Sequence, residues 1–241
     1  MDKYPLAILF DLDDTLISFD GASDKAWDKC SDDFVRQHSY PFTKSELLST
    51  LNKIRKWYWS DPERHKNGRE DMIKARRDIV GTALSEFDIC DIKISNEFAD
   101  YYSACQNELM CLFPNTISTL TKLKSKGVRM GIITNGSSVG QREKLSRFGL
   151  ESFFEIILID QEVGYSKPDT RIYEHALNLL SLNTDDVWMV GDNLIWDIQA
   201  PQSVGIYSVW NDYRKSGLPK DMKITPDRII FDISELIIGA V

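Results

Sequence analysis

From Phe113 onward, short apolar runs alternate with segments of helical periodicity, and this alternation most constrains the fold of the 241-residue chain. The predicted strands are 128–134, 156–159, 187–190, 206–209 and 228–231. The predicted helices are 116–126, 139–148, 170–182 and 194–204, with a closing helix from Ser234. Such alternation predicts the α/β class, in which a parallel sheet carries helices on both faces.

Residues 18–112 show helical periodicity and no strand signal. Apolar residues spaced three or four positions apart form four stripes there, which predict four helices. A buried strand is predicted just before this segment, at residues 7–10, because the run is short, apolar and without helical period. We therefore interpret residues 18–112 as an all-helical insertion into a core domain made of residues 1–17 and 113–241.

Three acidic residues follow the first predicted strand, in the stretch Asp11-Leu12-Asp13-Asp14. Because side chains alternate faces along a strand, Asp11 and Asp13 are predicted to point the same way. Two carboxylates held side by side repel one another unless a cation or a shared proton intervenes. Oxygen ligands favour a hard divalent ion such as Mg²⁺, whereas an acidic turn without a function is the alternative interpretation.

Polar residues also follow the second predicted strand. Thr134 and Asn135 precede a serine-rich helix start, whose hydroxyl and N–H groups would suit a phosphate oxygen. Ordinary capping of the helix by Ser137 or Ser138 is the simpler explanation of the serines alone.

Charged residues follow the next two strands. Lys167, before Pro168, could neutralise a carboxylate or a phosphate, although a lysine considered alone is usually solvated. Asp192 follows the strand at 187–190 and is the preferred metal ligand, with Asp197 on the first helical turn after it. Ligands of open α/β sheets lie beyond the carboxyl ends of the strands, so these groups are predicted to meet in one site.

Composition excludes several other functions. The net charge of −8 argues against a nucleic-acid partner, which clustered Lys and Arg would bind. No apolar stretch is long enough to cross a membrane and the N-terminus is no signal peptide, so a cytoplasmic location without membrane association is expected. The four cysteines form no Cys-x-x-Cys pair and predict neither a zinc site nor a disulfide framework.

These motifs resemble those of the haloacid dehalogenase superfamily over essentially the whole chain. The matching stretches are Asp11-Leu12-Asp13-Asp14-Thr15, Thr134-Asn135, Lys167-Pro168, and Gly191-Asp192-Asn193 to Asp197. The resemblance implies a Rossmann-like doubly wound parallel sheet with an inserted all-helical cap domain. It also implies a magnesium-dependent phosphatase that hydrolyses a small phosphomonoester, because the acid at Asp13 distinguishes phosphate-ester members from the dehalogenases and the transport ATPases.

The resemblance further implies a role for each motif residue. Asp11 is the nucleophile that forms an aspartyl-phosphate, and Asp13 is the general acid and then the general base. The substrate-binding residues of the core are Thr134, Asn135 and Lys167, of which Thr134 and Lys167 hold the transferring phosphoryl group. The metal ligands for Mg²⁺ are Asp11, the main-chain carbonyl of Asp13, and Asp192.

A looser resemblance concerns the substrate. The stretch Gln141-Arg142-Glu143-Lys144 and the segments 209–211 and 217–219 are similar to the capped subgroup of N-acylneuraminate-9-phosphatase and the pyrimidine 5′-nucleotidases. This implies a sugar phosphate or a nucleoside monophosphate as substrate.

Within the insertion, Arg69 closes an aromatic and basic stretch from Trp57 and is a candidate for substrate binding. A helix corner with solvated bases and an aromatic core face is the simpler explanation of the stretch. We expect a small phosphate ester as the partner and a monomer or weak homodimer. A phosphomutase and a non-catalytic scaffold remain alternatives.

Overall fold

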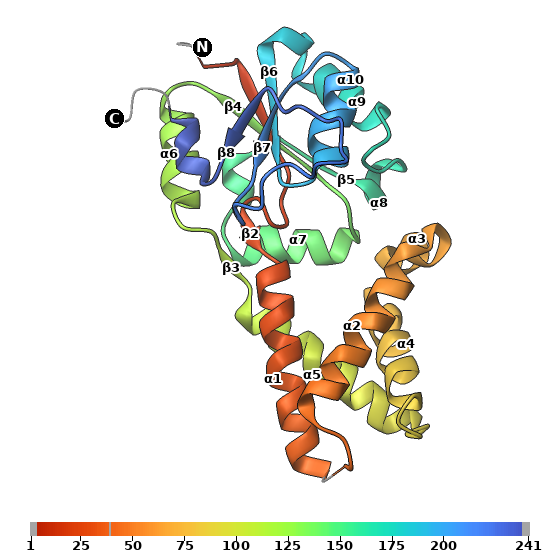
Figure 1. Ribbon diagram of the computed structural model, residues 1–241. Coiled ribbons are helices and arrows are strands. Elements are labelled where there is room, and N and C mark those ends of the chain that lie inside the picture. The colour runs from red at the N-terminus through yellow and green to blue at the C-terminus, as the bar shows by residue number, and fades with distance from the viewer. Residues whose placement is uncertain (1–3, 39, 238–241) are drawn as a thin grey trace. The chain divides into compact units, whose positions relative to one another are not determined.

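The computed structural model describes residues 4–38 and 40–237, and the chain divides into two compact units (Figure 1). The α/β unit comprises Met1–Ser18 and Leu112–Val241, and the helical unit comprises Phe19–Cys111. The chain passes between them at two short strands, β2 (Ile17–Ser18) and β3 (Cys111–Leu112), which pair in a two-stranded sheet.

A six-stranded sheet with the order β5-β4-β1-β6-β7-β8 forms the centre of the α/β unit. Its strands are β1 (Ala7–Phe10), β4 (Arg129–Thr134), β5 (Ile156–Ile159), β6 (Val187–Gly191), β7 (Tyr207–Asn211) and β8 (Arg228–Ile230). Every neighbouring pair is parallel, and Phe10 of the central strand lies opposite Ile132 and Val190. The predicted parallel α/β sheet is confirmed, and the carboxyl ends of β1, β4 and β6 lie at one edge.

The helices of the α/β unit lie between the strands along the chain, as the alternation predicts. They are α6 (Thr116–Ser125), α7 (Ser138–Arg147), α8 (Asp160–Val163), α9 (Arg171–Leu180) and α10 (Ala200–Ser203). Gly127 and Gly149 follow α6 and α7 with φ of 78° and 65°, a left-handed conformation in which glycine commonly ends a helix. Ala7 and Leu9 of β1 pack in one apolar cluster with residues of α9, including Tyr173.

Two predicted helices differ from the structure. The segment predicted as a helix at 194–204 is a π-helix at Leu194–Gln199 followed by α10. A search for a 3.6-residue period cannot distinguish so short a π-helix from an α-helix. Such π-turns often occur at functional sites. The predicted closing helix from Ser234 is a 3₁₀ helix at Ile233–Leu236, and residues 238–241 lie outside the described part of the chain.

The described residues of the helical unit form five α-helices instead of the predicted four. These are α1 (Asp20–His38), α2 (Lys44–Ser60), α3 (Pro62–Glu70), α4 (Met72–Ser85) and α5 (Ile92–Leu109). The additional helix, α3, has the sequence Pro-Glu-Arg-His-Lys-Asn-Gly-Arg-Glu, which contains no apolar stripe from which a helix could be predicted. It begins after Asp61, whose side chain accepts from the N–H of Arg64, and α2 begins with a capping box of Thr43 with Glu46.

The core of the helical unit contains stacked aromatic pairs among aliphatic side chains. Trp27 of α1 stacks on Tyr102 of α5 with ring centroids 3.6 Å apart, and Phe34 stacks on Phe98 at 4.6 Å. Across residues 4–38 and 40–237 the structure contains no helix that combines the length and the apolar character of a membrane span.

Candidate active site

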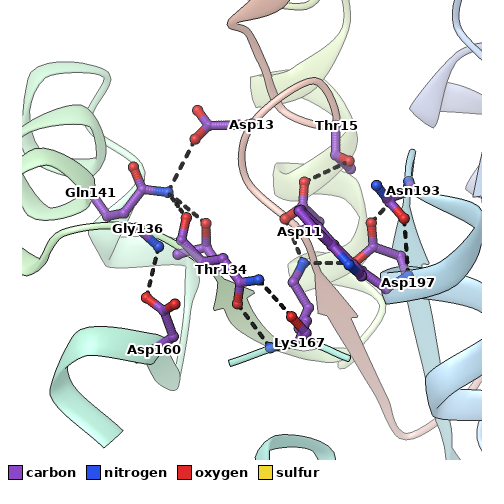
Figure 2. Close-up of polar contacts among 12 residues, drawn as sticks. Asp11, Asp13, Thr15, Thr134, Gly136, Gln141, Asp160, Lys167, Asn193 and Asp197 are labelled. Carbon is purple, nitrogen blue, oxygen red and sulfur yellow. Dashed lines mark hydrogen bonds and ion pairs between the residues drawn. The ribbon is translucent and has the colours of Figure 1, made fainter. Parts of the chain in front are cut away.

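Lys167 lies at the centre of a buried ionic group beyond the carboxyl ends of the central strands (Figure 2). Its side chain is 1% exposed, and its Nζ lies 2.6 Å from Asp11 Oδ1 and 2.6 Å from Asp197 Oδ1. Burial alone would lower the pKa of Lys167, but the two carboxylates raise it above its usual value. The two carboxylates therefore keep the ammonium in its charged form. Without them, a charge at this depth would be strongly unfavourable.

Asp11 directly follows β1, and its N–H donates to the carbonyl of Val190 at 2.9 Å. Its second carboxylate oxygen accepts a hydrogen bond from the Thr15 hydroxyl at 3.1 Å. Burial raises the pKa of Asp11 to about 7, against the opposing effect of Lys167. The carboxylate is thus held in place by a cation and a hydroxyl but only weakly hydrated, which favours reaction with an electrophile.

Asn135 fixes the backbone of Lys167. The Lys167 N–H donates to Asn135 Oδ1 at 2.9 Å, and Asn135 Nδ2 donates to the Lys167 carbonyl at 2.8 Å. This pair of bonds joins the segment after β4 to the loop that follows α8. The side-chain amide of Asn135 is engaged by the main chain of Lys167, and its assignment to substrate stays a prediction.

Asp192 and Asp197 belong to the turn and π-helix after β6. The carbonyl of Asp192 accepts from Trp210 Nε1 at 2.7 Å, and Asp197 Oδ2 accepts from the N–H of Asn193 at 3.0 Å. One carboxylate oxygen from each of Asp11, Asp192 and Asp197 lies within 4.8 Å of the other two. Burial raises the pKa of Asp192 well above its usual range, and the charges of Asp11 and Asp197 add to the effect.

These three carboxylates fit a divalent cation. One ammonium, that of Lys167, contacts Asp11 and Asp197, while Asp192 adds a third carboxyl group at the same place. Both oxygens of Asp197 accept hydrogen bonds from protein donors, and so do both oxygens of Asp11, so these bonds do not rank the two as ligands. The assignment of Asp11 and Asp192 as metal ligands stays a prediction. An all-oxygen set of this kind suits Mg²⁺.

Gly191 gives Asp197 the space it occupies. A Cβ at position 191 would lie 2.3 Å from Asp197 Cγ and 2.4 Å from its Oδ2. We expect Gly191→Ala to displace Asp197 from Lys167, to lower the free energy of unfolding by roughly 1–3 kcal/mol, and to reduce activity. Urea unfolding and initial rates check this expectation. In the matched control Gly81→Ala, the new Cβ would lie 4.0 Å from the side chain of Ser95. A loss of stability as large as that of Gly191→Ala would contradict the steric explanation.

Asp13 makes contacts different from those of Asp11. Lys144 Nζ lies 2.8 Å from its Oδ1 and 2.7 Å from its Oδ2, and Gln141 Nε2 donates to Oδ2 at 3.1 Å. The prediction that Asp11 and Asp13 project together from a strand is wrong, because β1 ends at Phe10 and the chain then turns, with Asp14 at φ 59°. Figure 2 shows the Asp13 carboxylate directed towards Gln141 and not towards Lys167.

Thr134 ends β4 and is buried, and its Oγ1 accepts from Gln141 Nε2 at 2.6 Å. Its hydroxyl proton is still able to reach a further acceptor, as phosphate binding would require. The N–H groups at the start of α7 have other partners: the N–H of Gly136 donates to Asp160, and that of Ser138 to Gln161, each at 2.7 Å. Ser137 caps the helix by accepting a hydrogen bond from the N–H of Gly140, as the simpler interpretation of these serines predicts.

Thr15 contacts Asp11, and Gln141 and Lys144 contact Asp13, but none of the three received an individual role from the sequence. The available signal was the spacing of Gln141 and Lys144, which places them on one face of a helix that starts beside Thr134. Their partners come from elsewhere in the chain and could not be inferred from that spacing.

Arg69 lies on α3 of the helical unit and is half-buried. A cavity of about 740 Å³ lies within this unit, lined by residues that include Trp57, Arg64, Asn67 and Lys74. The guanidinium of Arg64 lies 4.0 Å from the centre of the Trp57 ring and donates to the Trp57 carbonyl, so this part of the stretch forms a helix corner. A contact of Arg69 with substrate stays a prediction.

Known proteins share this sequence pattern and fold. The sequence profile of the haloacid dehalogenase-like hydrolases matches residues 8–211. Glyceraldehyde 3-phosphate phosphatase from Methanothermobacter thermautotrophicus is 32% identical over 203 residues, which are 84% of each chain. Pyrimidine 5′-nucleotidase YjjG from Escherichia coli is 26% identical over 231 residues, 95% of each chain.

The fold is also similar to that of YfnB from Bacillus subtilis, solved bound to magnesium. The TM-score is 0.73 at 21% identity, over 97% of each chain. At this identity the likeness concerns the fold alone. Since the family profile spans most of the sequence and a relative above 30% identity covers most of its length, the chain belongs to the haloacid dehalogenase-like hydrolase family.

Proposed function

We propose that this protein is a magnesium-dependent phosphatase that hydrolyses a small phosphomonoester through an aspartyl-phosphate intermediate. The observation that carries the proposal is the buried Lys167 ammonium, 2.6 Å from both Asp11 and Asp197, beside the third carboxylate of Asp192. An anionic nucleophile can attack an anionic phosphate only where positive charge is concentrated. The phosphatase activities of similar proteins named above support the same class of reaction.

In the first step, an Asp11 carboxylate oxygen attacks phosphorus as the bond to the ester oxygen breaks. Lys167 and the Thr134 hydroxyl hold oxygens of the transferring phosphoryl group, and Asp13 gives a proton to the departing ester oxygen. The protein acts here mainly by positioning and by charge stabilisation, as is usual for phosphoryl transfer.

In the second step, Asp13 takes a proton from water as that water attacks the phosphorus of the aspartyl-phosphate. Inorganic phosphate leaves and Asp11 regains its carboxylate. Asp11, Asp192 and the main-chain carbonyl of Asp13 would hold Mg²⁺, which supplies positive charge against the phosphate when bound. A carboxylate nucleophile thereby divides one difficult hydrolysis into two easier steps.

The proposed substrate is a sugar phosphate or a nucleoside monophosphate. We propose that the helical unit, Phe19–Cys111, acts as a cap domain that excludes large substrates. Arg69 is a candidate for contact with the leaving group. The test is a panel of phosphomonoesters assayed for phosphate release with Mg²⁺. Release that depends on Mg²⁺ supports the proposal, and a panel without any release contradicts it.

Removal of the metal gives a separate prediction. Mg²⁺ at 100 times its Kd is expected to stabilise the protein by about 2.7 kcal/mol, or roughly 5–10 °C in Tm. Asp192→Asn should abolish this rise in thermal-shift measurements. Without Mg²⁺ the variant should be no less stable than the wild type, because burial and like charges already disfavour the ionised Asp192. Asp221→Asn, on an exposed loop, is the control and should keep the full shift; an equal shift in Asp192→Asn would place the cation elsewhere.

A further inference from the structure

Asp13, Gln141 and Lys144 form a closed ring of hydrogen bonds in the α/β unit. Lys144 Nζ lies within 2.8 Å of both Asp13 oxygens and also donates to Gln141 Oε1 at 2.8 Å. Gln141 Nε2 completes the ring by donating to Asp13 Oδ2 at 3.1 Å. Each group therefore fixes the other two, and the carboxylate has two donors on one side.

Gln141 also joins this ring to Thr134. The same Nε2 donates to Thr134 Oγ1 at 2.6 Å and lies 3.3 Å from the Asn135 carbonyl. Gln141 is 3% exposed, and the loop after β4 closes over it: a Cβ on Gly136 would lie 3.1 Å from Gln141 Cδ. The amide consequently has little freedom to turn, and it holds the Thr134 hydroxyl and the Asp13 carboxylate at a fixed separation.

From this geometry we infer that Gln141 and Lys144, one turn apart on α7, are positioning residues that aim Asp13 at the leaving-group oxygen. The inference rests on the proposed phosphatase function and deepens it. Neither residue needs to touch the substrate, because both act through Asp13 and Gln141 also acts through Thr134. Positioning of this kind matters most for esters whose alcohol cannot leave without a proton.

The test compares two leaving groups. Nitrophenolate departs from p-nitrophenyl phosphate without a proton, whereas the alkoxide of glycerol 1-phosphate requires one. We expect Lys144→Met to lower kcat/KM for glycerol 1-phosphate by roughly 10–100-fold and for p-nitrophenyl phosphate by less than about 3-fold. Lys144→Arg, which keeps a charged donor, should restore most of the loss. The charge-matched control is Arg142→Met on the same helix, which breaks only the half-exposed pair with Glu162 and should change neither rate by more than about 2-fold.

A double-mutant cycle identifies the route of the effect. If Lys144 acts through Asp13, adding Lys144→Met to Asp13→Asn should cause no further loss with glycerol 1-phosphate. Equal losses for both esters, or additive losses in the Asp13→Asn background, would overturn the positioning role.

The possible failures are distinguishable. If phosphate release requires Asp11 and Asp13 but Lys144→Met shows no leaving-group dependence, only this inference is wrong. If the wild type hydrolyses neither ester nor any member of the panel, the proposed function is wrong as well.

Discussion

Asp11→Asn is expected to reduce kcat by a factor on the order of 10⁴ or more, because the amide oxygen is a far weaker nucleophile than the carboxylate. The shape of the side chain is retained, so substrate binding should change much less than kcat. The loss of charge should cost little stability, since burial already raises the pKa of Asp11 to about 7 and Asp197 still pairs with Lys167. Initial rates with Mg²⁺ and the best ester of the panel measure the effect.

Trapping of the intermediate makes this test more specific. Acid quench of the wild type during turnover should give protein heavier by one phosphoryl group, with the modification on the peptide that contains Asp11, and the Asn variant should give none. Asp221→Asn on an exposed loop is the matched control and should turn over at the wild-type rate. Activity of Asp11→Asn within tenfold of the wild type would show that Asp11 is not the nucleophile.

The sequence predicted the sheet well because strand and helix periods differ and because buried parallel strands are continuously apolar. The strand predicted at 128–134 is β4, Arg129–Thr134, and the one at 156–159 is β5 with the same bounds. Once these strands are placed in a parallel sheet, the residues that follow them must share an edge. This explains why Lys167 could be assigned to a site although most lysines are exposed.

The sequence did not predict how side chains from different elements pair. Asn135 is a residue type that often binds ligands. In the structure its side-chain amide forms hydrogen bonds with the main chain of Lys167, and this pairing depends on the path of a loop that is distant in the sequence. The sequence does not distinguish Gly191 from a glycine in an ordinary turn. In the structure, its lack of a side chain leaves the space that Asp197 occupies. Contacts of this kind depend on three-dimensional proximity, which periodicity and local propensity do not contain.

Lys167→Met is expected to affect stability and activity together. Methionine fills a similar volume without charge, so the variant leaves Asp11 and Asp197 buried without their cation. Breaking a buried ion pair in this way typically costs about 3–5 kcal/mol. The loss of a preorganised charge at the phosphoryl group should also lower kcat by roughly 10²–10³-fold. Urea unfolding and steady-state kinetics measure the two effects.

The pH dependence distinguishes lost charge pairing from lost packing in Lys167→Met. The pKa of Asp11 is raised from 3.8 to about 7 even with Lys167 present, and removal of the cation must raise it further. A carboxyl group whose pKa is higher in the folded state binds more protons there, so the metal-free variant should become more stable as the pH falls from about 8 towards 5. Its deficit relative to the wild type should shrink over the same range. A deficit that is equal at both ends would indicate a packing defect, and in that case adding Asp197→Asn, which removes one of the uncompensated charges, should not restore stability.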